Sequence, residues 1–470
     1  MASNKGIQRS KPPLPTNADM FAWARDIVEI TERYPEMRRL GTEGDAAVRA
    51  YIMAVLAQFG VDGIEEQPYE VSYQQVDRWG LEVAGAVVAC YFMRGAALTG
   101  EAGVTGELLY VGETIDPTMD YTGKIVVFDI RGQAVPGAAA PHLADFIYDP
   151  HGTLAQGTFG GQAGAIPANF PVSYYLAADQ GAVGMIGILK DYETGSNKFY
   201  SDPSAMVQAR IPALFVGKYD GAALVDQIRA ADHPLQATIV LNGERKSSTS
   251  ANIVVTLNGE KADTILINTH HDAGWSGAVQ DASGVAALLG LVKYFSRIPA
   301  NFRQKRLVFV FDGSHYDWNY PMGANLFADA NPDVMESVVL AMSVEHIAKK
   351  FKAEKGGYVD SGEIEPRLLF TPPNKLLFEL TKRAIVESNL HDVIIPKNGA
   401  ITMFGETQAY FLNGIPCFSY IAGPEYLFLA DDTLEKIADE QFEPVIKTFI
   451  TIIDGVIYWP ASWIERIDRF

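Results

Sequence analysis

The sequence predicts an α/β protein built on a mixed, mostly parallel sheet with helices on its faces. Two observations support this fold class. Strand-like and helix-like segments alternate from about residue 248 to 421, which is the order of an open α/β sheet. The run after Arg306 is apolar through Phe311, as in strands that are buried on both faces of a parallel sheet. Active sites in such sheets lie at the carboxyl ends of the strands, so a site is expected at that edge.

Two helices and a strand precede this pattern. Asn17 and Asp19 can cap a first helix over residues 20–34. Apolar residues at helical spacing predict a second helix over 43–59. A strand is expected at 66–73.

The middle of the chain differs in texture. From about residue 70 to 246, short apolar runs alternate with glycine and proline, which is typical of a strand-rich module. Residues 136–171 are rich in Gly, Ala and Pro without periodicity, so a long loop is expected there. The textures divide the chain into a tail (1–18), an α/β domain (19–69 with 247–470) and an inserted strand-rich domain (70–246).

The α/β domain should contain most of its strands after residue 248. Strands are predicted at 251–257, 264–269, 306–311, 337–344 and 415–421, and helices at 283–295 and 374–388.

Composition restricts the classes of function. Of 470 residues, 48% are hydrophobic and 20% charged, the balance of a folded globular protein. The net charge of −19 argues against partners that need a basic face, so neither nucleic acid nor a membrane surface is expected. The sequence shows no apolar signal core and no run long enough to span a bilayer, so a cytoplasmic protein is expected. Two cysteines are too few for a disulfide framework or a thiolate zinc cluster.

Four of the eight histidines lie at or just beyond the ends of predicted strands. His270 and His271 follow one strand, His315 follows the next, and His346 follows a third. Any one of them alone is more often a hydrogen-bonded loop residue than a ligand. Because the carboxyl ends of neighbouring strands meet, their convergence with carboxylates predicts a site for zinc or a similar divalent ion.

The segment THHDAGWSGAVQDASGVAALLGLVKYF, residues 269–295, resembles the central motif of the cocatalytic zinc aminopeptidase and glutamate carboxypeptidase family. In that family a strand ends in His-x-Asp, and a Gly-Ala-x-Asp-Asx-x-Ser-Gly turn opens a helix. Other segments resemble its opening helices, its inserted protease-associated domain and its closing segment, here GETQAYFLNGIPCF followed by DDTLEKI. The resemblance implies a zinc-exopeptidase-like fold, with residues 70–246 as a β-rich, protease-associated-like insert.

The family's functional residues match this chain only in part. His270 matches the first metal ligand, and Asp272 matches the carboxylate that orients it. The bridging aspartate falls on Gln280, which lacks the charge that holds two cations together. Glu345 matches the next acidic ligand, whereas the last ligand, a histidine, falls on Phe428.

The family's Glu-Glu pair falls on Ser314 and His315. The first glutamate is the general base, which a serine without a partner base does not replace. Histidine can replace the second, which is a ligand. The resemblance therefore predicts one divalent ion, zinc by preference, held by His270, His315 and Glu345 instead of a bridged pair.

Other residues are candidates to complete the site. Asp272, Gln280 and Ser314 are catalytic candidates, and a modest base is sought among His271, His346 and Glu406. The aromatic side chains that would line the substrate pocket are Trp275, Tyr316, Trp318, Tyr320 and Phe428. Packing is the competing explanation, because 11% of the chain is aromatic.

Two classes of function are open. The first is a single-metal enzyme, a hydrolase or a lyase or hydratase, acting on a small, partly aromatic or apolar non-peptide molecule. The second is a metal-free pseudoenzyme used for binding or assembly, and a conventional metallo-aminopeptidase is third. The enzyme is favoured, because a scaffold has no need for a histidine where a ligand was lost. Assembly into a homo-oligomer stays open.

Overall fold

The computed structural model describes residues 11–132, 135–154, 158–159, 169–200, 209–313, 323–401, 403 and 405–468. Its centre is a set of parallel strands, in the order β13 (Arg306–Asp312), β12 (Thr264–His270), β14 (Val338–Val344) and β19 (Cys417–Ala422). The strands predicted from the sequence at these places are confirmed within two residues at either end. Since the four strands are parallel, their carboxyl ends meet at one edge of the sheet.

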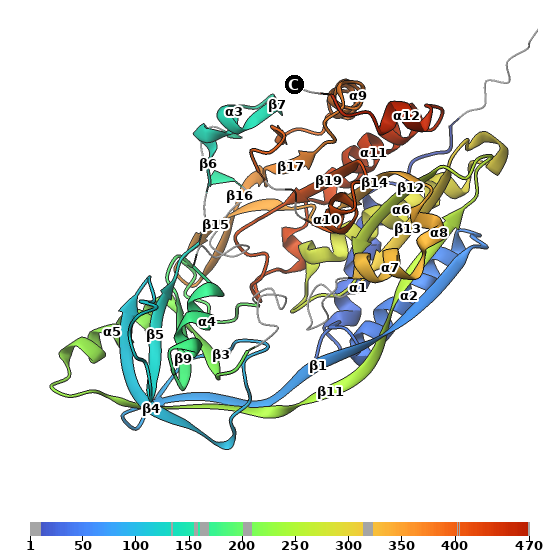
Figure 1. Ribbon diagram of the computed structural model, residues 1–470. Coiled ribbons are helices and arrows are strands. Elements are labelled where there is room, and N and C mark those ends of the chain that lie inside the picture. The colour runs from blue at the N-terminus through green and yellow to red at the C-terminus, as the bar shows by residue number, and fades with distance from the viewer. Residues whose placement is uncertain are drawn as a thin grey trace, which may run out of the picture.

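The same sheet extends in both directions. Beyond β19 lie β17 (Arg367–Phe370), β18 (Val393–Pro396) and β7 (Ala144–Tyr148), and beyond β13 lies the long β11 (Gln236–Leu257). β11 pairs along almost its whole length with β1 (Ile64–Val83), and this antiparallel ribbon crosses the molecule in Figure 1. The fold is therefore mixed α/β, as predicted.

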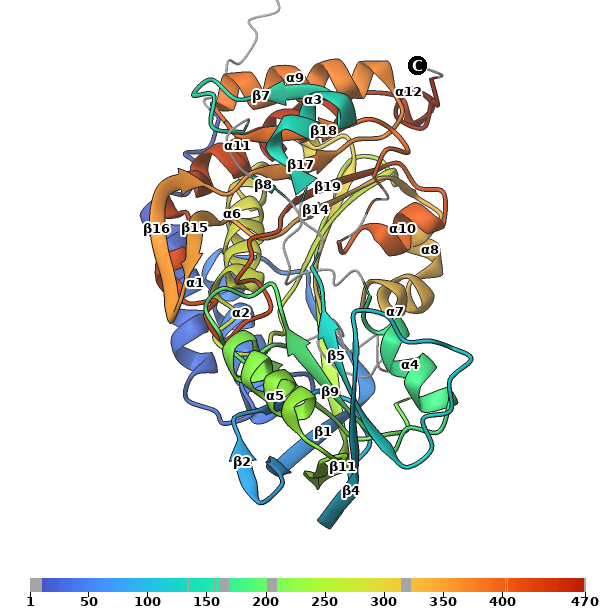
Figure 2. The same cartoon turned by 90° about the vertical axis from the view of Figure 1, so that its left-hand side faces the viewer.

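Helices cover both faces of the central strands (Figure 2). One face packs against α1 (Asn17–Thr31), α2 (Glu43–Gln58), α6 (Gly284–Ser296), α9 (Lys375–Ser388) and α11 (Phe442–Val456). The other face packs against α7 (Gly323–Ala330) and α10 (Gln408–Leu412), with α8 (Pro332–Met335) following α7. Because both faces of the sheet are buried, the central strands have apolar side chains on both faces and not on one face alone.

The first helix begins three residues earlier than predicted. Its cap is Thr16, whose hydroxyl accepts from the backbone N–H of Asp19 at 3.1 Å while the Asp19 carboxylate accepts from the N–H of Thr16 at 3.3 Å. Asn17 is the first helical residue and not the cap.

The strand-rich region continues the sheet through β4 (Gly100–Gly112), β5 (Lys124–Ile130), β9 (Gly184–Leu189), β10 (Ala213–Gly217) and β3 (Tyr91–Phe92). Its helices are α4 (Val172–Asp179) and α5 (Lys218–Ala230), and β2 (Ala86–Val88) pairs with β1. Both expected domain boundaries, near residues 70 and 246, fall inside the continuous strands β1 and β11. The division into an α/β domain and an insert stays a prediction.

The long loop predicted over residues 136–171 is wrong for part of its length. β7 lies within it and pairs antiparallel with β18 at the far edge of the sheet, with Ile147 opposite Ile394. Shorter pieces surround it: β6 (Val135–Pro136), α3 (Ala140–Leu143) and β8 (Thr158–Phe159). Five residues, ADFIY, are too short to show a period against the Gly, Ala and Pro around them, so only pairing with β18 makes them a strand.

Several elements were not predicted, among them α7, α10, α11, β17 and β18. A hairpin of β15 (Lys349–Glu354) and β16 (Gly357–Ile364) stands apart from the main sheet, and α12 (Ala461–Ile464) lies near the C-terminus. Across the described residues, no helix combines the length and the apolar character that a membrane span requires.

Candidate metal centre

A layer of polar side chains lies on one face of the central strands, close to their carboxyl ends. Alternation along β12 puts Asn268 and His270 on the same face as Leu266, which packs towards α7 and α10. Register puts Asp312 of β13 beside His270, and the Asn268 amide donates to its carboxylate at 2.8 Å. Ser343 of β14 lies beside Asn268, so Glu345, two residues further along and directly after the strand, lies on this face too. These side chains are almost completely buried.

Three of these groups can hold one metal ion. His270, Glu345 and His346 each offer a ligand atom, and these atoms all lie within 4.8 Å of one another. The two imidazole rings meet nearly edge to face, with their centroids 6.4 Å apart. From the sequence, His270 and Glu345 are expected to be ligands, whereas His346 is only a candidate base.

Each of the three side chains is also held by a hydrogen bond from its other end. His270 Nδ1 lies 2.9 Å from the backbone oxygen of Asp272, and His346 Nδ1 lies 2.7 Å from the backbone oxygen of Ala422. A carbonyl oxygen only accepts, so both rings carry their proton on Nδ1 and have the lone pair on Nε2, the tautomer of a metal ligand. Glu345 Oε1 accepts from the backbone N–H of Glu406 at 2.9 Å, so Oε2 is its candidate ligand atom.

His346 reaches the centre through an uncommon backbone conformation. Its φ of 57° lies in the left-handed region, which few non-glycine residues adopt. Its N–H donates to Asp281 Oδ1 at 3.0 Å, and Asp281 also accepts from Thr269 Oγ1 and from the N–H of Gly284. Asp281 therefore joins the end of β12, the start of α6 and His346. It has the helix-capping role that is an alternative to a catalytic one for a residue at this position.

Gly405 lies so close to Glu345 that there is no room for a side chain at this position. A Cβ on Gly405, whose φ is +93°, would lie 2.6 Å from Glu345 Oε1 and 3.1 Å from Ser419 Oγ. Only a residue without a side chain fits between this carboxylate and the sheet.

We expect Gly405→Ala to displace Glu345 and to weaken metal binding. Gly399→Ala is the matched control, because Gly399 has a φ of +79° and no atom within 4 Å of an added Cβ. Both variants should lose on the order of 1–3 kcal/mol of stability from backbone strain. Only Gly405→Ala should change the affinity for zinc, measured by competition with a chromophoric chelator. Equal affinities in the two variants would contradict the placement of Glu345.

Beside Glu345, two buried carboxyl groups are neighbours. Burial raises the pKa of Asp312 well above its usual range, and the neighbouring Glu406 carboxylate raises it further by repulsion and by stabilising the protonated form of Asp312. The backbone N–H of Glu406 donates to Glu345, so Asp312 and Glu406 lie next to this candidate ligand. Glu406, a candidate base in the sequence analysis, is thus placed at the centre.

The site collects buried carboxyl groups that suit a cation. Asp272, Asp281, Asp312 and Glu406 are 0% exposed, and Glu345 is 1% exposed. Burying several carboxyl groups costs free energy unless a positive charge or a proton compensates them. Two imidazole nitrogens and one carboxylate oxygen are the donor set of many zinc sites that keep an open position. The residues present therefore fit a single zinc ion.

The remaining histidine and glutamine candidates lie differently. The ring of His271 contacts the backbone oxygen of Ala251 at 3.1 Å and Asp45 at 3.5 Å, and burial lowers its pKa to about 4. Its role as a candidate base stays a prediction. Asp272 holds His270 through its backbone oxygen, while its carboxylate lies 3.4 Å from the ring nitrogen. Gln280 is buried, and its backbone N–H donates to Asp432 at 3.0 Å.

Five predicted site residues lie outside the residues that the structure describes: Ser314, His315, Tyr316, Trp318 and Tyr320. The proposal that His315 is a ligand stays a prediction. The other two aromatic candidates pack against the strand-rich region: Trp275 lies 5.0 Å from the Tyr91 ring, and Phe428 lies 6.3 Å from that of Phe199.

A cavity of about 570 Å³ lies at the opposite ends of the central strands. Val338 at the start of β14 and Cys417 at the start of β19 line it. It is separate from the polar layer, which lies at the other end of the same strands.

Part of the chain is similar to a known protein family. Residues 252–358 match the family model described as Peptidase family M28. A search of the curated proteins finds no match.

Solved structures with similar folds include three from bacteria. The peptidase M28 precursor of Shewanella amazonensis SB2B has 15% identity, 94% coverage of each chain and a TM-score of 0.68. The zinc aminopeptidase BSAP of Bacillus subtilis has 16% identity, covers 96% of this chain and 98% of its own, and has a TM-score of 0.65. The aminopeptidase of Aneurinibacillus sp. strain AM-1 has 21% identity, 93% coverage of each chain and a TM-score of 0.62. Residues 252–358 are therefore similar to Peptidase family M28, and the chain has a fold similar to those of these solved aminopeptidase structures.

Proposed function

We propose that this protein is an enzyme that uses one divalent metal ion, zinc by preference, on a small, partly aromatic or apolar molecule. The observation that carries the proposal is the meeting of His270, Glu345 and His346, whose ligand atoms lie within 4.8 Å of one another. Each of the three is held by a hydrogen bond through its other polar atom, so the donor atoms are preorganised for an ion.

A zinc ion bound there would supply a Lewis acid that polarises a substrate oxygen and lowers the pKa of water. The chain's own groups would do the rest. Glu345 and the two imidazoles orient the reacting centre, and Asp312, whose pKa is raised by burial and by Glu406, favours its protonated form next to them. Such a centre suits hydrolysis, or an elimination or hydration that needs a Lewis acid and a modest base.

Peptidase activity should be weak. In the family that this chain resembles, the general base falls on Ser314 and the bridging aspartate on Gln280. A general base contributes roughly 10²–10⁴-fold to the rate, and a neutral amide does not bridge two cations. Phe428 stands where the last histidine ligand would be, and it packs against Phe199.

Metal content decides between the proposal and its alternatives. Purified protein is saturated with zinc, dialysed and measured by inductively coupled plasma mass spectrometry, and in parallel assayed on amino-acid anilides, dipeptides and small aromatic esters and amides. We expect one equivalent of zinc and peptidase turnover far below the ~1–10³ s⁻¹ of ordinary enzymes.

Other stoichiometries overturn the proposal. Two equivalents with brisk peptide hydrolysis identify a conventional metallo-aminopeptidase. Protein that binds no zinc or other divalent ion is a metal-free pseudoenzyme.

A further inference from the structure

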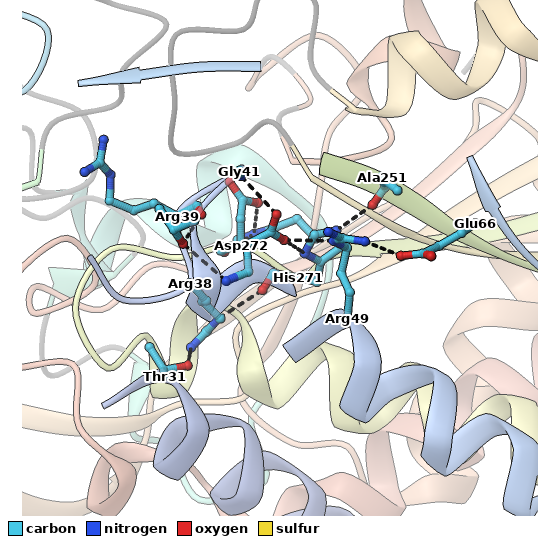
Figure 3. A network of polar contacts seen from close by, with 12 residues as sticks. Thr31, Arg38, Arg39, Gly41, Arg49, Glu66, Ala251, His271 and Asp272 are labelled. Carbon is cyan, nitrogen blue, oxygen red and sulfur yellow. Dashed lines mark hydrogen bonds and ion pairs between the residues drawn. The ribbon is translucent and has the colours of Figure 1, made fainter. Parts of the chain in front are cut away.

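A buried arginine lies next to the loop that joins the two candidate histidine ligands. Arg38 follows α1 in the chain and is 0% exposed. Figure 3 shows its guanidinium between Thr31 and His271, with Arg39 extending in the opposite direction. A guanidinium has five N–H donors and keeps its charge, so its burial requires acceptors on several sides.

One acceptor is the Thr31 hydroxyl, which accepts from Nη1 at 3.0 Å. The others are backbone oxygens of the segment 271–280, a loop that continues into the π-helical turn Ala278–Ser283 and is called the loop below. Nε donates to the carbonyl of His271 at 2.9 Å, and Nη1 donates to that of Ser276 at 2.7 Å. Nη2 donates to the carbonyls of Gly277 at 2.6 Å and Gln280 at 3.3 Å. One side chain thus binds the loop at its beginning, middle and end.

Backbone N–H groups of the same loop are bound by an acidic residue. The Asp432 carboxylate accepts from the N–H of Val279 at 2.8 Å and from that of Gln280 at 3.0 Å. Arg38 collects carbonyl oxygens, and Asp432 collects N–H groups. The peptide at Gln280 is therefore held between a buried cation and a buried carboxyl group.

Both ends of the loop continue into the metal centre. His271 follows the candidate ligand His270 directly. Gln280 precedes Asp281, which accepts from the N–H of the other ligand, His346. A shift of the loop would therefore move His270 at one end and the support of His346 at the other.

We propose that Arg38 is a positioning residue for the metal centre, acting through the carbonyl groups of the loop 271–280. Its hydrogen bonds named above go to the Thr31 hydroxyl and to backbone oxygens of the loop, none of which is a candidate ligand atom. It sets the distance between the two imidazoles by fixing the loop that connects their supports. The inference rests on the proposed centre at His270, Glu345 and His346.

Arg39 is a matched control for Arg38. The two residues are adjacent, and Arg39 is 1% exposed, but its Nη2 donates to the carbonyl of Gln74 at 3.0 Å on β1 and its guanidinium lies over the Tyr73 ring. Replacing either arginine removes a buried cation of the same size. These contacts of Arg39 lie on β1, whereas those of Arg38 lie on the loop.

The experiment compares Arg38→Met and Arg38→Lys with Arg39→Met and Arg39→Lys in the full-length protein. Zinc affinity is measured by chelator competition, and amide hydrogen exchange of residues 272–282 is measured without metal. We expect Arg38→Met to weaken zinc binding by ~10–100-fold, the cost of losing an outer support of a metal site, and to speed exchange in the loop. Arg38→Lys should show smaller changes in zinc affinity and in loop exchange than Arg38→Met. Its ammonium group still binds some of the carbonyls, although fewer than the guanidinium does.

Both Arg39 variants should lose thermal stability but keep zinc affinity and loop exchange near those of the wild type. Equal zinc affinity in the Arg38 and Arg39 variants overturns the inference. If Arg38→Met does not fold, the comparison of Arg38→Lys with Arg39→Lys decides. Wild-type protein that binds no divalent ion overturns the proposed centre instead, and loop exchange then tests the role of Arg38 alone, where unchanged exchange rejects it.

Discussion

Replacing His346 with alanine should remove zinc binding, with a loss of affinity greater than ~100-fold. Loss of an outer support typically costs 10–100-fold, and His346 is expected to contribute a ligand atom itself. The variant should remain folded, since the apolar faces of the sheet form the core and the lost hydrogen bond to Ala422 is worth about 1 kcal/mol. Isothermal titration with zinc and thermal unfolding are the two measurements.

A second variant and a control complete this test. His346→Asn keeps a side chain that tolerates the left-handed backbone at residue 346 but provides no imidazole, so it should lose zinc as well. His391→Ala removes a partly buried histidine whose Nδ1 lies 2.6 Å from Asp392, beside β18, and should leave zinc binding unchanged. Zinc affinity within a few-fold of wild type in both His346 variants would rule out His346 as a ligand.

Glu365→Gln should stabilise the protein increasingly as the pH rises from 4.5 to about 8. Burial raises the pKa of Glu365 from 4.5 to about 8, Lys350 opposes this rise, and Glu425 and Glu363 add to it. Between these pH values the folded state keeps a proton that the unfolded chain has released, so the wild type loses stability as the pH increases. The pKa difference corresponds to on the order of 5 kcal/mol in the free energy of unfolding. Glutamine has no proton to lose, so the variant does not undergo this loss of stability.

The measurement is urea unfolding of both proteins at several pH values. The difference in free energy of unfolding, variant minus wild type, should grow between pH 4.5 and 8 and then level off. Glu363→Gln is the control, because this neighbouring carboxylate is partly exposed and paired with Lys350 at 2.8 Å. It contributes only a minor part of the raised pKa of Glu365, so its removal should give a much smaller growth. A constant difference across the window would show that the Glu365 carboxyl is not buried in the folded protein.

The sequence by itself was enough to predict the central sheet and the strand ends that carry its polar residues. Apolar runs that are buried on both faces are unambiguous, and parallel strands must bring their carboxyl ends together. This pattern of strand ends in the sequence indicates His270 and Glu345. It also located His346, but it could not assign its role, because adjacent residues at the end of a strand ordinarily face opposite ways.

Only the tertiary structure decided that His346 faces the same centre as His270 and Glu345. The reason is the left-handed backbone at His346, supported by Asp281, which is 65 residues away in sequence. Arg38 and β7 show the same limit. A buried arginine more than 230 residues from the carbonyls it binds, and a five-residue segment that becomes a strand only by pairing with β18, carry no local signal. Local patterns determine which segments are apolar and regular, whereas contacts between distant segments determine which polar groups meet.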